Sequence, residues 1–195
     1  MSAVSRVLEF KQRWEAPTLV LVDLHEGAPA SSPRPDHDGF LHALAKCRAA
    51  LTFARQRGFP VAFVRHMSPS PSFLAMHTCP SWIQDVRPAR SDMIFERPLP
   101  SCYASSEFDQ MARRSGGLVL AGIFGETSCL STLMDGYSRN HLFTYLTDAS
   151  VSRGHNGIAA HDMHRCVVGI ASIYGEISDT GAWIDRMSRK TGEVP

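Results

Sequence analysis

The chain has 195 residues, twenty basic against nineteen acidic side chains, a formal net charge of +1 and 44% hydrophobic residues. A chain of this length is typical of one domain that buries a full core without disulfides or a structural metal, so we expect a single domain over residues 1–195. The even charge argues against a nucleic-acid or membrane-surface protein, and no apolar run reaches the roughly 18 residues of a transmembrane helix.

The cysteines predict a reducing compartment. The five cysteines stand far apart, at positions 47, 79, 102, 129 and 166, and no two of them form a CxxC pair. This spacing is typical of reduced, cytoplasmic proteins rather than of disulfide scaffolds. The first ten residues mix charges with apolar side chains and lack the apolar centre of a secretion signal. We therefore expect a cytoplasmic protein whose partner is a small-molecule substrate, with no nucleic acid and no membrane bound.

Apolar runs and helical periodicities alternate along the chain. The run Pro17–Leu24, rich in β-branched residues, predicts a strand buried on both faces. Apolar residues then recur at helical spacing from Phe40 to Ala54, and Gly58 is placed to end that helix. A second strand is expected at Pro60–Arg65. Because a helix connects the two strands, they should pair in parallel.

The same alternation continues after a long segment rich in Ser and Pro at residues 66–88. Further strands are expected at residues 92–96, 117–123, 142–148 and 176–177, and further helices at residues 105–114, 130–137, 156–173 and 179–187. The alternation predicts an α/β fold with three αβα layers, built around a mostly parallel, six-stranded, Rossmann-like sheet. Ligands bind such sheets outside the carboxyl ends of the strands.

Three reactive residues fall at these predicted strand ends. Asp23 ends the first strand, Arg97 follows the third, and Cys129 lies in the first turn of the helix after the fourth. A helix N-terminus and a nearby cation both lower the pKa of a thiol and make it a nucleophile. Asp23 is suited to take the thiol proton, and the backbone amides of Ser128 and Cys129 are suited to hold an oxyanion. We predict Asp23, Arg97 and Cys129 as the catalytic residues.

Each of these residues also has a simpler interpretation. Free cysteines usually fill space on helix faces, and on position alone this is the more common role for Cys129. The other four cysteines fit it fully, because two lie on apolar helix faces and two in loops that open no helix. Arg97 could be one half of a surface ion pair.

Substrate contacts are expected from the loops around the same edge. Aromatic rings can sandwich a flat or apolar group, while polar side chains beside the nucleophile can bind an amide or an ammonium group. Ordinary packing or solvation explains each residue equally well. The candidates are His25, Phe73, Trp82, Tyr103, Glu126 and Thr127.

Four motifs together resemble the isochorismatase-like cysteine hydrolase superfamily. They are Leu-Val-Leu-Val-Asp23, Ile-Phe-Glu-Arg97-Pro-Leu-Pro-Ser-Cys-Tyr103, Leu-Ala-Gly-Ile-Phe-Gly-Glu-Thr-Ser-Cys129 and Leu-Thr-Asp148-Ala. No single motif is decisive, but their order and spacing are specific, and the resemblance runs from Pro17 to Ile184. It implies a mainly parallel six-stranded sheet between helices, in agreement with the periodicity.

The resemblance also implies a mechanism. Hydrolases of the superfamily use an Asp, a Lys and a Cys, and the Cys attacks an amide or imide carbonyl to form a thioester that water cleaves. Asp23 and Cys129 match the Asp and Cys, whereas the Lys position falls on Arg97, which keeps its charge and cannot shuttle a proton. A cis peptide often precedes the nucleophile in the family, here within residues 124–128.

The resemblance does not predict a metal site, and it predicts a homo-oligomer. The nicotinamidases of the superfamily bind a metal through an Asp-x-His pair and a later His, and no such spacing follows the second strand. We expect no metal and no cofactor. Members often form dimers and larger assemblies, so a homo-oligomer, a dimer or a tetramer, is expected, with Trp183 as one candidate for its interface.

The predicted activity is hydrolysis of a C–N bond in a small amide, imide or carbamoyl compound through a cysteine thioester. An isochorismatase-type vinyl-ether hydrolase, with Asp23 as the acid, is an alternative, because the spacing from Gly122 to Cys129 is longer than in the cysteine branch. A non-catalytic relative that binds ligands is a third possibility, which the departure at Arg97 keeps open.

Overall fold

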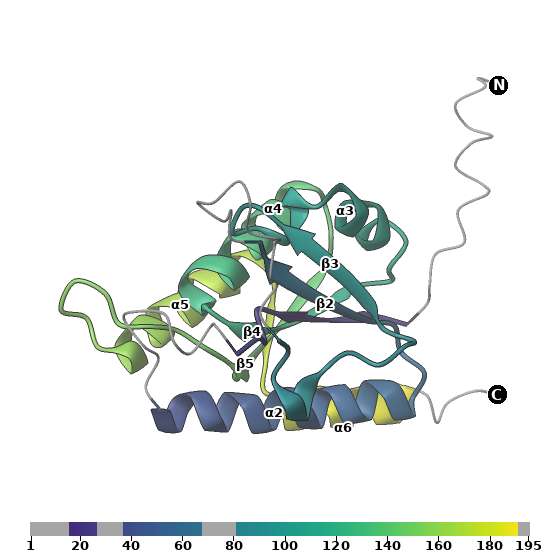
Figure 1. Ribbon diagram of the computed structural model, residues 1–195, viewed down its shortest axis with the longest axis horizontal. Helices are drawn as coiled ribbons and strands as arrows, with labels where there is room; N and C mark the ends of the chain where they lie inside the picture. The colour runs from purple at the N-terminus through teal and green to yellow at the C-terminus, as the bar shows by residue number, and fades with distance from the viewer. Residues whose placement is uncertain (1–15, 27–36, 68–80, 191–195) are drawn as a thin grey trace, which may run out of the picture.

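The computed structural model of the protein describes residues 16–26, 37–67 and 81–190. Within these ranges six parallel strands form one sheet in the order β3-β2-β1-β4-β5-β6 (Figure 1). The strands are β1 (Thr18–Val22), β2 (Val61–His66), β3 (Met93–Arg97), β4 (Leu118–Ile123), β5 (Phe143–Val151) and β6 (Glu176–Ser178). The expected α/β fold with a parallel six-stranded sheet is confirmed.

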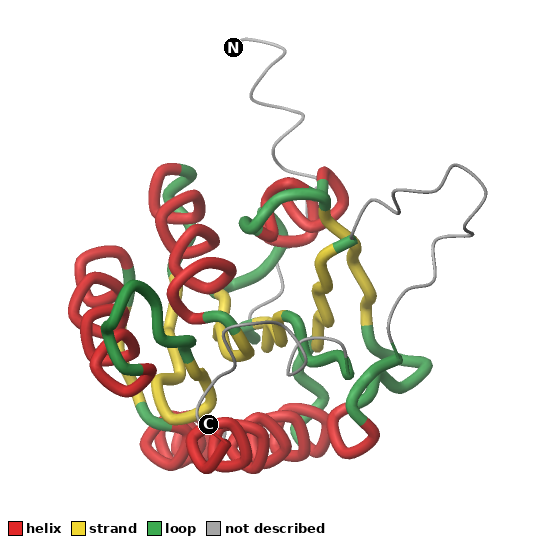
Figure 2. Tube along the Cα trace, turned by 60° about the vertical axis from the view of Figure 1, so that its left-hand side comes forward, coloured by secondary structure: helices red, strands yellow, loops and turns green. Residues whose placement is uncertain are grey.

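Helices cover both faces of the sheet (Figures 1 and 2). One face carries α2 (His37–Gln56) and α6 (Thr180–Lys190), and their apolar side chains share a core with β1, β2 and β4. The opposite face carries α3 (Ser106–Ala112), α4 (Leu130–Ser138) and α5 (Ala160–Tyr174), which form a second core. The central strands β1 and β4 are buried along their whole length, which explains their continuous apolar sequences.

Gly122 allows the two central strands to approach closely at their carboxyl ends. Its partner in the register is Val22, and its φ angle is +140°, a value that side-chain-bearing residues rarely adopt. A Cβ atom at this position would lie 2.2 Å from the carbonyl oxygen of Val22. Only glycine therefore fits, and it brings the residues that follow β1 and β4 together.

The structure differs from the predicted elements mainly at the end of β5. This strand runs on to Val151, with a register shift against β4 between Leu120 and Gly122. The helix predicted from residue 156 begins at Ala160, because residues 155 and 158 instead form a short antiparallel bridge around Asn156 and Gly157, both of positive φ.

Other residues are placed more simply. Trp183, expected at an interface, is 1% exposed and packs edge-on against Phe53 in the core beneath α2. Phe73 and Cys79 lie outside the described residues. No helix within the described ranges combines the length and the apolar character needed to cross a bilayer.

Candidate active site

Asp23 lies at the centre of a buried polar network at the carboxyl edge of the sheet. It follows β1 with a φ angle of +57° and is 1% exposed. Its Oδ1 accepts a hydrogen bond from the backbone amide of His66, the last residue of β2, at 3.0 Å. The strained backbone conformation turns the carboxylate toward the neighbouring strand ends.

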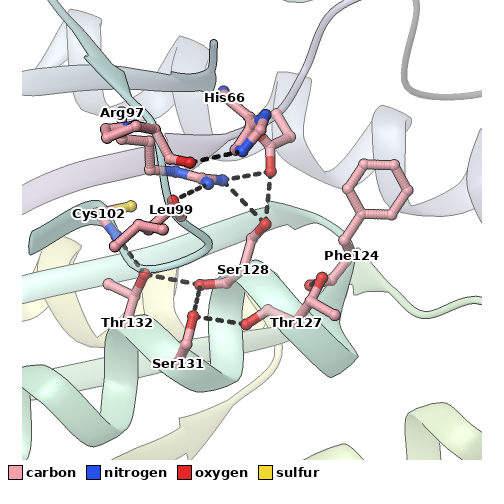
Figure 3. A network of polar contacts seen from close by, with 11 residues as sticks. His66, Arg97, Leu99, Cys102, Phe124, Thr127, Ser128, Ser131 and Thr132 are labelled. Carbon is pink, nitrogen blue, oxygen red and sulfur yellow. Dashed lines mark hydrogen bonds and ion pairs between the residues drawn. The ribbon is translucent and has the colours of Figure 1, made fainter. Parts of the chain in front are cut away.

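Arg97 reaches this carboxylate from β3, which is separated from β1 by β2. Its side chain is fully buried, and Nη2 donates to Asp23 Oδ2 at 2.5 Å. The same nitrogen donates to Ser128 Oγ at 2.9 Å, while Nη1 donates to the carbonyl of Leu99 at 2.7 Å. Figure 3 shows the guanidinium directed at Ser128 and Leu99. Arg97 is therefore a buried partner of Asp23, not half of a surface ion pair.

Ser128 completes the network from the turn after β4. Phe124, with a φ angle of +62°, ends the strand, and residues Gly125–Cys129 form one wide helical turn that leads into α4. Ser128 Oγ donates to Asp23 Oδ2 at 2.6 Å. The hydroxyl thus lies between a carboxylate that can take its proton and a cation that can stabilise the resulting negative charge.

Cys129 does not share this position. Its side chain is fully buried in the core on the α3–α4–α5 side, with Cys102, Leu133 and Tyr145 in the same cluster. Burial raises the pKa of the Cys129 thiol well above its ordinary value, and the nearby Cys102, Asp23 and Glu126 raise it further. Its backbone amide donates to the carbonyl of Phe124 at 3.3 Å.

The expectation of a lowered thiol pKa is therefore wrong, because the residue faces the core. The side chain of Ser128 bonds to Asp23, while that of Cys129 packs in the core with Cys102 and Leu133. The prediction includes Ser128 only through its backbone amide and misses its side chain, because the sequence does not show which residue of this turn faces the site.

The turn that carries Ser128 is held by a second charged group. Glu126 has a side chain only 6% exposed, and its Oε1 accepts from Arg153 Nε at 2.8 Å. The guanidinium of Arg153 stacks over the Phe124 ring at 4.2 Å, and His155 lies 3.6 Å from Glu126. Glu126 was expected to contact substrate, but these contacts engage it within the protein.

The remaining predicted contacts fall in different places. The backbone of His25 forms an antiparallel bridge with Trp82, whose ring lies 4.9 Å from the Arg65 guanidinium. Tyr103 is buried in the core, and its hydroxyl lies 2.6 Å from Nδ1 of His141. The hydroxyl of Thr127 is 3.5 Å from the carbonyl of Phe124.

Metal ligands were also sought around the site. Among the described residues, no three His, Cys, Asp or Glu side chains are grouped so that they could hold a metal ion. The ring of His66, close to Asp23, lies 3.1 Å from the carbonyl of Pro98 through Nε2.

The structure thus combines a parallel αβα sheet with an Asp, a cation and a hydroxyl that meet at its carboxyl edge. The model of the Isochorismatase domain matches residues 17–173, so the chain belongs to the isochorismatase family of hydrolases.

Solved structures share the fold, and one curated protein is similar in sequence over part of the chain. A putative isochorismatase from Burkholderia xenovorans superposes with a TM-score of 0.78 at 21% identity, over 92% of this chain and 90% of that one. A cysteine hydrolase from Pseudomonas syringae pv. phaseolicola also superposes with a TM-score of 0.78, at 19% identity over 91% and 96% of the two chains. Ureidoacrylate amidohydrolase RutB from Acinetobacter baylyi is 29% identical over 106 residues, which span 53% of this chain and 41% of that protein.

Proposed function

We propose that the protein hydrolyses a C–N bond of a small amide, ureide or carbamoyl compound, and that Ser128 is the nucleophile. The observation that carries the proposal is the 2.6 Å hydrogen bond from Ser128 Oγ to Asp23 Oδ2, beside the guanidinium of Arg97. The similarity to an enzyme named ureidoacrylate amidohydrolase supports C–N hydrolysis. The burial of Cys129 in the core supports Ser128 in place of a cysteine.

The first half of the proposed reaction forms an ester. Ser128 Oγ attacks the carbonyl carbon while its proton passes to Asp23, and Arg97 stabilises the developing charge. The backbone amide of Ser128 is the proposed oxyanion donor, whereas the amide of Cys129 is already bonded to Phe124. As the intermediate collapses, the C–N bond breaks, and Asp23 gives its proton to the leaving nitrogen. An acyl group remains on Ser128.

Water completes the turnover. Its oxygen attacks the acyl carbon, one of its protons is taken by a base, and the bond to Ser128 Oγ breaks. The product acid leaves and Ser128 recovers its proton. Arg97 keeps its charge throughout, so its part is electrostatic and the proton transfers of the first half fall to Asp23.

A panel of small amides and ureides, including ureidoacrylate, tests the proposal through ammonia or amine release and mass spectrometry. We expect an acyl adduct on the peptide that contains Ser128. Ser128→Ala should lower kcat/KM by about three orders of magnitude or more, as loss of a nucleophile does in other hydrolases. Cys129→Ala, one residue away, is the matched control and should stay within about threefold of the wild type.

Vinyl-ether hydrolysis is the second candidate, because the hydrogen bonds of the site converge on the Asp23 carboxylate, and no cysteine takes part in those bonds among the described residues. In that reaction Asp23 donates a proton to the substrate and no acyl adduct forms. Activity that survives Ser128→Ala but not Asp23→Asn would favour it. Activity lost in Cys129→Ala and kept in Ser128→Ala would instead restore the thioester mechanism.

A further inference from the structure

His25 is a buried base beside the active site whose ring is incompletely bonded. It follows Asp23 by two residues, and its backbone amide donates to the carbonyl of Asp23 at 2.9 Å. The residue is 9% exposed, and Nδ1 has no hydrogen-bond partner within the described part of the chain. Buried polar atoms in native proteins are normally paired, so an open one beside an active site points to a missing ligand.

Burial favours the neutral form of His25. Burial lowers the pKa of His25 below its ordinary value, and the positive charges of Arg65, Arg97 and His66 act in the same direction. The carboxylate of Asp23 acts in the opposite direction. Among the described residues, these four groups are the charges that act on the ring, and the net effect of burial and charge is an imidazole that is a base at neutral pH.

From this geometry we infer that His25 is the general base of the second half-reaction and takes a proton from the hydrolytic water through Nδ1. The inference rests on the proposed function, since it requires an acyl group on Ser128. Once Ser128 is acylated, Asp23 still accepts hydrogen bonds from the His66 amide at Oδ1 and from Arg97 at Oδ2, whereas Nδ1 of His25 has no hydrogen-bond partner among the described residues. In the tautomer that carries its proton on Nε2, Nδ1 offers a free lone pair to a water molecule, and His25 follows Asp23 by two residues.

The proposed step transfers one proton from water to His25 and then to Ser128. A water O–H bond breaks, and its proton goes to Nδ1 while the water oxygen bonds to the acyl carbon. The ester bond to Ser128 Oγ then breaks, and the proton returns from the imidazolium to that oxygen. No oxidant, reductant or further reactant is required, and the products are the free acid and the starting enzyme.

The active ester p-nitrophenyl acetate tests the inference, because it separates the two halves. A burst of p-nitrophenolate reports acetylation of Ser128, and the steady state reports hydrolysis of the acetyl enzyme. His25→Gln should keep the burst within about threefold of the wild type and slow the steady state by about 100-fold, the range of a lost general base. His161→Gln is the matched control, because that side chain is 75% exposed on α5, and it should match the wild type.

A pH profile adds a measurement that a structural role would not change. In the wild type the steady-state rate should rise with pH through a midpoint below the ordinary histidine value, because only the neutral ring is a base. His25→Gln should lack that inflection while its unfolding transition stays cooperative.

Two results overturn the inference. One is a His25→Gln enzyme that acetylates and turns over like the wild type, and the other is a variant that loses the burst itself, which would place His25 in acylation. Failure of the proposed function looks different, because it appears as a wild-type enzyme with no acetyl group on Ser128.

Discussion

The two edges of one sheet differ in how they hold their polar groups. At the carboxyl edge, Asp23 and Arg97 form an ion pair in which the side chains are 1% and 0% exposed. At the amino edge, Leu142 and Ile173 line a groove of about 730 Å³, and the side chains of the nearby ion pair between Arg186 and Glu176 are 34% and 52% exposed. Loss of one partner of the buried pair leaves an uncompensated charge in the protein and costs stability. The pair at the amino edge contributes little to the free energy of unfolding, because water screens it.

The largest expected difference lies between the two ion pairs. Arg97→Met leaves the carboxylate of Asp23 buried without its cation and should reduce the free energy of unfolding by about 3–5 kcal/mol. Arg186→Met at the amino edge should cost less than about 1 kcal/mol, because water screens that pair. Urea denaturation of both variants measures the contrast. Equal losses would show that burial does not distinguish the two edges.

The close approach of β1 and β4 gives the next largest effect. Gly122→Ala places a methyl group against the backbone of Val22 and should cost about 1–3 kcal/mol, with loss of activity as Asp23 and Ser128 move apart. Gly169 on α5 faces open space, so Gly169→Ala should stabilise the protein by about 0.5–1 kcal/mol. Thermal unfolding gives both numbers, and a neutral Gly122→Ala would contradict the packing described here.

The buried thiols make stability depend on alkaline pH. Burial raises the pKa of Cys102 to about 11, whereas thiols in an unfolded chain titrate near about 8.5. Above that value the folded state binds more protons than the unfolded state, so the free energy of unfolding falls as pH rises, by about 1.4 kcal/mol per thiol and pH unit. Between about pH 9 and about pH 10, the decrease in the free energy of unfolding should be smaller in Cys102→Ala than in the wild type by roughly that amount. Cys166→Ala, which removes an exposed thiol, should leave the slope unchanged.

Tyr103 should give the smallest effect. Its hydroxyl contacts His141, close to the start of β5, so Tyr103→Phe should cost about 1 kcal/mol of stability and leave KM unchanged. Calorimetry and steady-state kinetics with the best substrate of the amide panel measure the two quantities. A several-fold rise in KM would instead show that Tyr103 contacts the substrate, as the sequence predicts.

The sequence predicted the fold well because its signals are local. Continuous apolar runs mark β1 and β4, and the alternation of strands and helices fixes a parallel sheet. The sequence also predicted that Asp23 and Arg97 meet, although they are 74 residues apart, because each lies at the carboxyl end of a parallel strand in the same sheet. The sequence does not determine which of two consecutive residues in a turn faces that edge.

The choice between Ser128 and Cys129 depends on the backbone at Phe124 and on the width of the turn that follows it. A positive φ at a non-glycine residue has no reliable sequence signal, and one such angle rotates every later side chain in the turn. By residue type alone, the thiol of Cys129 is a better nucleophile than the hydroxyl of Ser128. Burial in the core reverses that preference.

The position of Arg97 on β3 connects activity to folding. This strand is at the end of the sheet, so the active site is incomplete until the last strand on that side has paired with β2. The contact between Arg97 and Asp23 closes a long loop, and contacts between residues so far apart in the sequence slow folding. A chain in which β3 has not yet paired with β2 therefore lacks the cation of its active site, and catalysis would begin only once β3 has joined the sheet.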